Sequence, residues 1–356
     1  MTEYPRVVVD LSKIRENVKK LTKKCKEFQI DVVGITKVFS GNIEIAKVFV
    51  EGGVRYLGDS RVKNLKKYEN LDVPKIMIRL PMRSQIKEII KHVDISLNSE
   101  ISTIVLLNEE AGKQYRVHRI ILMLELGDLR EGILPEDVER YMEQINSMKN
   151  IKLEGIGVNL TCYGGIIPSF DNLGQLEKIS DLIEEKYNLK LNVISGGNSS
   201  SLDLLWKSNM PSKINNLRLG ESLIFGRETA YGKDLEGCFY DSVKLEAEII
   251  ELKEKQSYPV GEIGFNAFGE KPTFIDRGKR KRAILAIGKQ DVDQFSLKAM
   301  DEKLIILGAS SDHLVLDVTD SKIEYKVGDI VEFKLDYGSL LQLTTSPYVK
   351  KVFNEN

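Results

Sequence analysis

A lysine at the end of an apolar run is the first residue in this chain whose type and position indicate chemistry. Lys37 closes the run VVGITK, residues 32–37, which has the apolar character of a buried strand. In barrels of parallel strands, catalytic side chains lie at the carboxyl ends of the strands. Lys37 is therefore either a solvated strand end, which is common because lysine is seldom buried, or an amine held in a pocket. Its position alone leaves both interpretations open.

Two glycine-containing segments further along the chain offer hydrogen-bond donors to an anion. Residues 195–201 read SGGNSSS, and residues 218–222 read RLGES. Amides of glycine-rich loops and neighbouring hydroxyls bind phosphate, and barrels usually hold phosphate between the loops that follow strands seven and eight. Either segment alone is also ordinary turn chemistry. Together with Lys37 they predict a pocket for a phosphorylated aldehyde bound to an amine, a description that pyridoxal 5'-phosphate fits.

The cysteines and histidines show no pattern of a metal site. The chain has three of each, without the short-range partners that a zinc site or a disulfide framework requires. These residues are Cys25, Cys162, Cys238, His92, His118 and His313. We therefore expect no bound metal, and we expect reduced cysteines in a cytoplasmic setting.

The segments that must position the candidate residues alternate between short apolar runs and amphipathic stretches. Helical segments are predicted at 85–91, 136–148 and 172–186, and a first helix is expected to have Ser12 as its cap and to bury Ile14, Val18 and Leu21. Strands are predicted near residues 32–36, 54–57, 75–79, 93–97, 119–124, 153–158, 190–194 and 216–224. This alternation predicts an α/β fold, a TIM-type (β/α)8 barrel over residues 11–235.

The pattern changes after about residue 235. Short runs bounded by Gly, Asp and Lys follow, with little helical periodicity, and LLQLT at residues 340–344 is the last of them. These runs predict an all-β C-terminal domain over residues 236–356.

Length and composition narrow the class of protein further. The chain has 356 residues, of which 42% are apolar and 29% charged, with a formal net charge of −1. This is the composition of a globular protein, and the neutral balance gives no attraction to nucleic acid. The apolar runs are far shorter than the roughly 20 residues of a membrane helix, and the start MTEYPRVVVD lacks the pattern of a secretory signal. We expect neither nucleic acid nor a membrane as a partner.

Five stretches of the chain resemble the alanine racemase family of fold-type III pyridoxal-phosphate enzymes, and most of all its ornithine racemase branch. In chain order they are VVGITKVFSG, LGDLREG, SGGNSSS, LRLGES and TTSPYVKK. The resemblance covers nearly the whole chain and implies a barrel followed by a β domain, which a first strand within residues 1–10 joins. It also implies pyridoxal 5'-phosphate as the cofactor and a homodimer with composite active sites.

The resemblance assigns roles to residues in each stretch. Lys37 would hold the cofactor as a Schiff base and act as a base, while Arg130 would support the cofactor's phenolic oxygen and the substrate carboxylate. Arg218 would face the pyridine nitrogen. The remaining cofactor contacts, mainly to the phosphate, would come from Asn198, Ser199, Gly220, Glu221 and Tyr348.

A guanidinium at the position of Arg218 would decide which reaction is favoured. Because arginine keeps its proton at neutral pH, a pyridine nitrogen that faces it stays unprotonated. The cofactor is then a weaker electron sink, which favours return of the proton to the α-carbon over transamination or decarboxylation. An ordinary salt bridge at a strand end is the alternative interpretation of Arg218.

The chain departs from the family pattern at its second base and at the cofactor ring. Asn159, in GVNLT, stands where the family has a histidine stacked on the ring. Where alanine racemases carry a catalytic tyrosine after an Ile-Gly pair, the chain reads AIGKQD, so that Lys289 stands at the matching position. The second acid/base therefore stays open between Lys289, Tyr337, Asp291 and Ser310.

A hydroxyl- and carboxylate-rich segment stands where the family has its substrate loop. It reads LGASSDH and contributes Ser310, Ser311 and Asp312, with Asp291 on a neighbouring stretch. A diamino acid needs such oxygens around its distal ammonium, because an unpaired buried cation is costly, although a solvated turn explains the same residues. We predict a two-base racemase of ornithine or another basic amino acid such as lysine, with Asp312 as the partner of the side-chain ammonium.

Other functions stay open on sequence alone. They are an alanine or broad-spectrum racemase, a decarboxylase or dehydratase of the same fold type, and a non-catalytic carrier of pyridoxal phosphate. A carrier is expected to end after the barrel, whereas this chain continues for about 120 residues.

Overall fold

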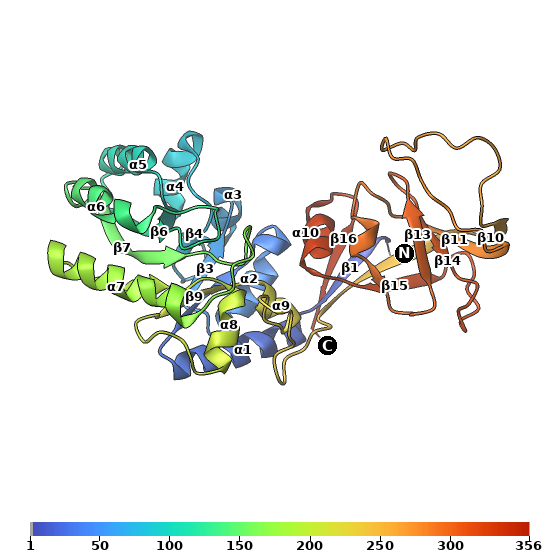
Figure 1. Cartoon of the computed structure of the whole chain (residues 1–356), viewed down its shortest axis with the longest axis horizontal. Coiled ribbons are helices and arrows are strands. Elements are labelled where there is room, and N and C mark those ends of the chain that lie inside the picture. The colour runs from blue at the N-terminus through green and yellow to red at the C-terminus, as the bar shows by residue number, and fades with distance from the viewer. Residues whose placement is uncertain (1–2, 356) are drawn as a thin grey trace. The chain divides into compact units, whose positions relative to one another are not determined.

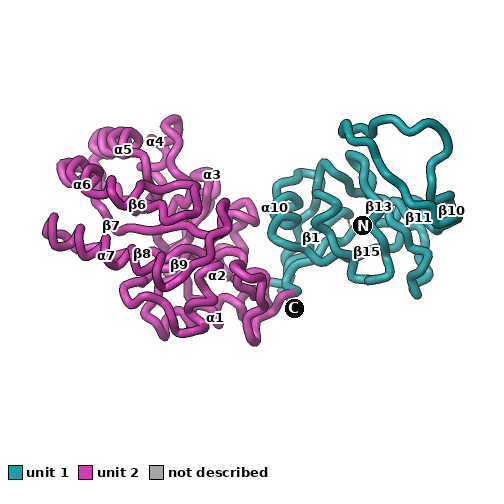
Figure 2. Tube along the Cα trace, in the orientation of Figure 1, with its two compact units in different colours: residues 1–10, 241–356 teal, residues 11–240 magenta. Residues whose placement is uncertain are grey.

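Residues 3–355, which the computed structural model describes, divide into two units (Figure 2). Among these residues, one unit spans Leu11–Tyr240, and the other combines residues 3–10 with residues 241–355. The boundary between the barrel unit and the C-terminal part of the second unit lies between Tyr240 and Asp241, whereas the sequence predicts it after residue 235.

Parallel strands close into a barrel in the unit Leu11–Tyr240 (Figure 1). Among the described residues, the barrel has the eight strands β2 (Asp31–Ile35), β3 (Tyr56–Asp59), β4 (Lys75–Met77), β5 (Ile95–Asn98), β6 (His118–Leu124), β7 (Ile151–Val158), β8 (Val193–Ser195) and β9 (Asn216–Leu219). Each strand pairs with the next one along the chain, and β9 pairs with β2 to close the ring. The predicted fold class is confirmed, and each predicted run overlaps a barrel strand.

Apolar side chains from these strands fill the barrel interior. One buried cluster consists of Val33, Ile35, Ile76, Ile95, Leu97, Ile121, Met123 and Val193. Branched residues of this kind dominate the layers inside such barrels. At one point the strands approach so closely that only glycine fits, because a Cβ at Gly155 in β7 would lie 1.8 Å from the carbonyl oxygen of Val193 in β8.

Helices alternate with the strands around the barrel (Figure 1). They are α1 (Leu11–Glu27), α2 (Ile43–Glu51), α3 (Val62–Leu65), α4 (Ile86–His92), α5 (Ile101–Lys113), α6 (Val138–Asn146), α7 (Phe170–Tyr187), α8 (Leu202–Trp206) and α9 (Glu221–Phe225), with short 3₁₀ turns η1 (Lys37–Phe39), η2 (Lys66–Tyr68), η3 (Arg83–Gln85), η4 (Pro135–Asp137) and η5 (Ser199–Ser201). Helix α1 buries Ile14, Val18 and Leu21, as predicted. The prediction that Ser12 caps this helix is wrong, because α1 begins at Leu11 and Ser12 lies inside it.

The last predicted barrel strand is shorter than its apolar run. Strand β9 ends at Leu219, Gly220 leaves the extended conformation, and α9 follows at once. Leu223, Ile224 and Phe225 in α9 are buried, so an apolar run that was assigned to one strand serves both a strand and a helix.

The second unit is a largely antiparallel sheet with one helix among its described residues. Its elements are β1 (Arg6–Asp10), β10 (Val243–Gln256), β11 (Lys279–Leu285), β12 (Lys298–Ala299), β13 (Ile305–Ala309), β14 (Leu314–Asp317), β15 (Ile330–Lys334), β16 (Lys350–Asn354), α10 (Tyr337–Thr345) and the turn η6 (Gln294–Ser296). The strand order is β12-β15-β10-β11-β14-β13, and β1 pairs antiparallel with β10 and parallel with β16.

The run LLQLT was predicted as a strand and is instead part of helix α10. A capping box starts this helix, with the Asp336 carboxylate accepting from the Ser339 amide and the Ser339 hydroxyl accepting from the Asp336 amide. Leu340 and Leu343 are then buried on one helical face. The capping residues precede the run, so the run by itself did not reveal the helix.

Neither a membrane-spanning helix nor a metal-binding cluster is found in the part of the chain that the structure describes. Within residues 3–355, no helix combines the length and the apolar composition that crossing a bilayer requires. In the same part of the chain, the His, Cys, Asp and Glu side chains form no group of three or more that could hold a metal ion.

Candidate active site

Lys37 lies at the carboxyl end of the barrel. Strand β2 ends at Ile35, and Lys37 is the first residue of the short helix η1, with its side chain partly buried. This is the end of a parallel barrel at which active sites are built. The placement agrees with an amine held at the barrel mouth.

A buried carboxylate holds the residue before Lys37. The Thr36 hydroxyl donates to Asp59 Oδ2 at 2.9 Å, and Asn64 Nδ2 donates to Asp59 Oδ1 at 2.9 Å. Burial raises the pKa of Asp59, and these hydrogen bonds oppose the rise. Asn64 also packs against Gly41, where a Cβ would lie 2.5 Å from the Asn64 Cβ. The sequence analysis did not identify Asp59, which joins β3 to the segment that carries Lys37.

The two glycine-containing segments meet, as the phosphate-site hypothesis requires. Ser199 Oγ donates to Ser222 Oγ at 3.0 Å and accepts from the Ser222 amide at 3.2 Å. Asn198 Oδ1 accepts from the Ser200 amide at 2.9 Å, which shapes the turn η5. The Ser200 hydroxyl is buried without a hydrogen-bond partner among the described residues. Such a group needs a partner, and a bound phosphate oxygen would satisfy it.

Arg218, in β9, is buried inside the barrel, with 4% of its surface exposed. Nη2 donates to the Val158 carbonyl and to Asn159 Oδ1, both at 2.6 Å, and Nη1 donates to the Ser195 hydroxyl. Burial lowers the pKa of Arg218 to about 10, so the group is still a cation at neutral pH. Because these hydrogen-bond partners are neutral oxygens, the arrangement differs from an ordinary strand-end salt bridge.

Arg130 and Asn159 are brought together by a residue that the sequence analysis did not identify. Arg130 donates through Nη2 to Glu131 Oε1 at 2.7 Å and through Nε to Glu131 Oε2. Asn159 Nδ2 donates to the same Glu131 carboxylate. Burial lowers the pKa of Arg130, but hydrogen bonding to Glu131 and the nearby negative charges together outweigh burial, and the net shift of the pKa is upward. The structure thus places Arg130, Asn159 and Arg218 in one hydrogen-bonded chain.

Carboxylates also hold the loop that carries Arg130. Glu125 accepts from the amides of Gly127 at 2.5 Å and of Arg130 at 3.1 Å. Asp128, which is fully buried, accepts from the Tyr163 amide at 2.9 Å. The loop after β6 is therefore tied to the loop after β7, which limits the positions open to the Arg130 backbone.

In the second unit, the predicted substrate residues lie beside the predicted second base. The Lys289 amide donates to the Ser310 carbonyl at 2.9 Å, and the Gln290 amide donates to the Ser311 carbonyl at 2.9 Å. Lys289 Nζ lies 3.2 Å from Glu270 Oε2 and 4.1 Å from the centre of the Phe268 ring. The ammonium of Lys289 is therefore held as part of an ion pair.

The Asp312 carboxylate lies at the surface of the second unit. It is 2.7 Å from His313 Nδ1 and accepts from the Ser310 hydroxyl at 3.3 Å. The hydrogen bond with His313 is the main reason that the pKa of Asp312 is lowered. Asp312 is thus an exposed anion at neutral pH.

The other predicted residues of this unit have different environments. Asp291 is 3% exposed and accepts from the Ser346 hydroxyl at 2.6 Å, so its carboxylate holds the chain after α10. The role of Asp291 as a substrate contact stays a prediction. Tyr337 is the partly buried first residue of α10, and Tyr348 is 68% exposed.

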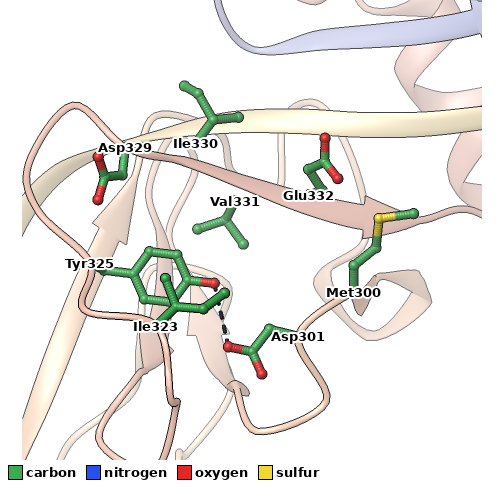
Figure 3. Close-up of a pocket in the computed structure, with 8 residues that line it drawn as sticks. All are labelled: Met300, Asp301, Ile323, Tyr325, Asp329, Ile330, Val331 and Glu332. Carbon is green, nitrogen blue, oxygen red and sulfur yellow. Dashed lines mark hydrogen bonds between the residues drawn. The ribbon is translucent and has the colours of Figure 1, made fainter.

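A cavity of about 360 Å³ lies elsewhere in the second unit (Figure 3). Its lining includes Asp301, Tyr325 and Glu332, and none of the lining residues is a predicted site residue. The Tyr325 hydroxyl donates to Asp301 at 3.4 Å, and burial raises the pKa of Tyr325 to about 12. Glu332 pairs with Lys244. These polar groups are satisfied by their neighbours, and the cavity lacks the donors that a phosphate needs.

The residues at the barrel mouth fit pyridoxal phosphate. The cofactor requires an amine for its aldehyde, clustered donors for its phosphate and polar partners around its ring. Lys37 supplies the amine, the buried Ser200 hydroxyl supplies a donor, and Arg218 supplies a buried cation. Asn159 stands where the family has a stacking histidine. Its amide is hydrogen bonded at both ends, to Glu131 and to Arg218, so this side chain has a polar role here.

Comparison with known proteins gives matches along nearly the whole chain. Residues 9–228 match the family described as alanine racemase, N-terminal domain. An ornithine racemase of Acetoanaerobium sticklandii is 47% identical over 98% of this chain and 99% of that protein, and a lysine racemase of Thermotoga maritima is 38% identical over 98% of each. The crystal structure of alanine racemase from Bartonella henselae with covalently bound pyridoxal phosphate aligns with a TM-score of 0.76 at 17% identity, over 99% of this chain and 100% of that one. This chain therefore belongs to the alanine racemase family and is a pyridoxal-phosphate-dependent amino-acid racemase.

Proposed function

We propose that this enzyme interconverts the L- and D-enantiomers of a basic amino acid, with ornithine as the preferred substrate. The observation that carries the proposal is its similarity, over nearly the full length, to racemases of ornithine and of lysine. Both amino acids carry a distal ammonium, which requires oxygen partners when it is withdrawn from water.

We infer that Lys37 is the cofactor lysine and the base for one face of the substrate. Pyridoxal phosphate, when bound, draws electron density from the α-carbon of an amino acid and makes its proton easier to remove. The Lys37 amine, held at the barrel mouth by η1 and by the Thr36–Asp59 hydrogen bond, takes that proton or returns it.

The other barrel residues are proposed to bind the cofactor and to orient the substrate. In this proposal, the hydroxyls of Ser199 and Ser200 and the amides of Gly220 and Glu221 hold the phosphate, with Asn198 shaping the loop. Arg218 would lie next to the ring nitrogen as a cation, which would favour racemisation over decarboxylation. Arg130 binds the substrate carboxylate and the phenolic oxygen.

The second unit is proposed to supply the opposite face of the site. Lys289 and Tyr337 are both candidates for the second acid/base, and Tyr348 is proposed as an additional phosphate contact. Asp312, with Ser310 and Ser311, is proposed to bind the distal ammonium of the substrate, since it is an exposed carboxylate with a lowered pKa.

We propose that two copies form an isologous homodimer in which the second unit of each copy completes the site of the other. The family resemblance supports this assembly. A cytoplasmic location is proposed from the cysteines, since Cys25, Cys162 and Cys238 are free thiols.

The test is racemisation of single enantiomers. L-ornithine, L-lysine and L-alanine are each incubated with the enzyme and pyridoxal phosphate, and the D-enantiomer is measured by chiral chromatography. We expect ornithine to react fastest, lysine next and alanine far more slowly. A preference for alanine, or racemisation that persists after Lys37→Ala, would overturn the proposal, with Lys47→Ala on the surface helix α2 as the control.

A further inference from the structure

A single carboxylate connects both arginines of the barrel mouth. Glu131 accepts two hydrogen bonds from Arg130, through Nε and Nη2, and a third from Asn159 Nδ2. The same Asn159 amide accepts from Arg218 Nη2 at 2.6 Å through Oδ1. The four side chains form a continuous path from the loop after β6, across the end of β7, to Arg218 near the carboxyl end of β9.

The path runs from solvent into the barrel. The Arg130 side chain is 41% exposed and that of Glu131 is 14% exposed, whereas Asn159 and Arg218 are buried. Electrostatic interactions strengthen as water is excluded, so the inner part of the path is sensitive to a missing charge.

Arg218 is a buried cation whose hydrogen-bond partners within residues 3–355 include no carboxylate. Burial lowers its pKa, and the negative charge of Glu131 is the largest opposing influence. Glu131 is thus the charge that compensates Arg218, although Asn159 lies between them.

The side chain at position 159 must donate at one end and accept at the other. An asparagine amide does both, because Nδ2 meets the Glu131 carboxylate while Oδ1 meets the Arg218 guanidinium. An aspartate could not donate to Glu131 and would repel it. This requirement gives a physical reason for Asn159 where the family pattern has a stacking histidine.

We propose that Glu131 is a positioning residue that sets the orientation of Arg130 directly and of Arg218 through Asn159. The inference rests on the proposed function, because it assumes that these arginines face the substrate and the cofactor. In this proposal Glu131 acts through the two guanidinium groups, with Asn159 as the link to Arg218.

The test compares Glu131→Gln, Glu131→Asp and Asn159→Ala with wild type. Glu136→Gln, which removes the same charge from an exposed residue nearby, is the control. The readouts are the affinity of the cofactor-free protein for pyridoxal phosphate, the absorbance of the bound cofactor against pH, KM and kcat for ornithine, and the thermal midpoint of the cofactor-free protein.

For Glu131→Gln we expect cofactor affinity to fall about 10- to 100-fold, the range that corresponds to one charge-assisted hydrogen bond. We also expect KM to rise, because Arg130 loses its anchor, and the alkaline change in cofactor absorbance to move to lower pH, because Arg218 loses its compensating charge. Glu131→Asp restores part of each effect. Asn159→Ala reproduces the shift in the absorbance profile but changes KM less, since the Arg130–Glu131 pair is intact.

Several results would overturn the inference. One is a Glu131→Gln enzyme that matches the Glu136→Gln control in affinity, absorbance profile and KM. Another is an equal loss in all variants that follows the thermal midpoint alone, which would make Glu131 a purely structural residue. A third is an Asn159→Ala enzyme with an unchanged absorbance profile. The proposed function fails separately, if wild type takes up no cofactor or does not racemise basic amino acids.

Discussion

Arg218 gives a quantitative test of whether the barrel mouth is built for stability or for binding. The substitution is Arg218→Met, which keeps a long flexible side chain and removes the charge and the donors. It leaves the Val158 carbonyl and Asn159 Oδ1 without the guanidinium that now binds them. A buried acceptor without a donor costs about 1–3 kcal/mol, so the two together cost about 2–6 kcal/mol.

An opposing contribution comes from removing a buried charge. Burial lowers the pKa of Arg218 from 12.5 to about 10, and at about 1.4 kcal/mol per pKa unit this corresponds to about 3 kcal/mol spent in keeping the cation in the barrel. Methionine avoids this cost. The two contributions nearly cancel, and we expect the free energy of unfolding of the cofactor-free protein to change by no more than about 3 kcal/mol.

The assay follows urea unfolding of the cofactor-free protein by fluorescence. The chain has one tryptophan, and it is Trp206 at the end of α8, so the signal reports the barrel unit. Affinity for pyridoxal phosphate is measured on the same samples and is expected to fall at least about tenfold. The control is Arg119→Met, because Arg119 is a partly exposed arginine on the barrel strand β6.

Two outcomes would refute this reasoning. A loss above about 5 kcal/mol in unfolding free energy would mean that the hydrogen bonds of Arg218 outweigh its desolvation and that the residue is mainly structural. An unchanged affinity for the cofactor would mean that Arg218 does not face it. A small change in stability combined with a large loss of affinity is the expected result.

Three further predictions concern the lysine, the substrate carboxylate and a buried histidine. Borohydride treatment of the enzyme with pyridoxal phosphate should add pyridoxyl mass to the peptide that contains Lys37, as mass spectrometry would detect; a label on another lysine contradicts the assignment. Asp312→Asn should lower kcat/KM for ornithine about tenfold or more while leaving that for alanine nearly unchanged, because only ornithine has a distal ammonium to pair; an equal loss on both substrates would exclude a role in specificity. His118 is 3% exposed, and burial lowers its pKa from 6.5 to about 4. As the pH falls, the unfolded chain therefore binds a proton at this histidine before the folded chain does. The free energy of unfolding should then decrease between about pH 6.5 and pH 4, by up to about 3 kcal/mol. In the His118→Gln variant, the urea midpoint should change less with pH over this range than it does in wild type. If it changes as much as in wild type, other groups cause the pH dependence.

The barrel was predictable because its strands are buried on both faces. Such strands read as continuous runs of Val, Ile and Leu, separated by amphipathic helices. The strand β6 is an example, with Ile120 to Leu124 all fully buried. Each run could therefore be recognised without knowledge of its neighbours.

The sequence-based predictions of secondary structure were wrong where an apolar run forms a helix, or is divided between a strand and a helix. LLQLT reads as a strand, but the box formed by Asp336 and Ser339 in front of it starts a helix. The run at 216–224 continues through Gly220 because α9 is short and buried on several sides. Apolar character identifies buried segments, whereas capping residues decide which of them are helical.

In the site, residues in or directly after the barrel strands could be predicted, but the side chains that hold them could not. Lys37 and Arg218 follow or lie in recognisable strands, so their place at the barrel mouth follows from topology. Asp59 and Glu131 act through contacts with Thr36 and Asn159, which lie 23 and 28 residues away in the chain. Only the folded loops bring these partners together, and no spacing rule in the sequence encodes such a contact.

Stability and chemistry are separated along the barrel axis. Val33 and Ile121 belong to the apolar cluster that fills the barrel, whereas the polar residues Asp59 and Ser195 are the last residues of β3 and β8. Arg218 reaches this polar layer from β9 through its hydrogen bond to Ser195. Substitutions in the apolar layer should therefore lower the free energy of unfolding, because a cavity in this layer removes packing from every strand around it. The site should change only as a consequence of that loss of stability. Substitutions in the polar layer remove groups whose burial is costly, so their main effect should appear in cofactor affinity and pH dependence. A racemase needs this arrangement because both enantiomers must meet the same rigid array of donors, which only a scaffold stabilised elsewhere can hold in place.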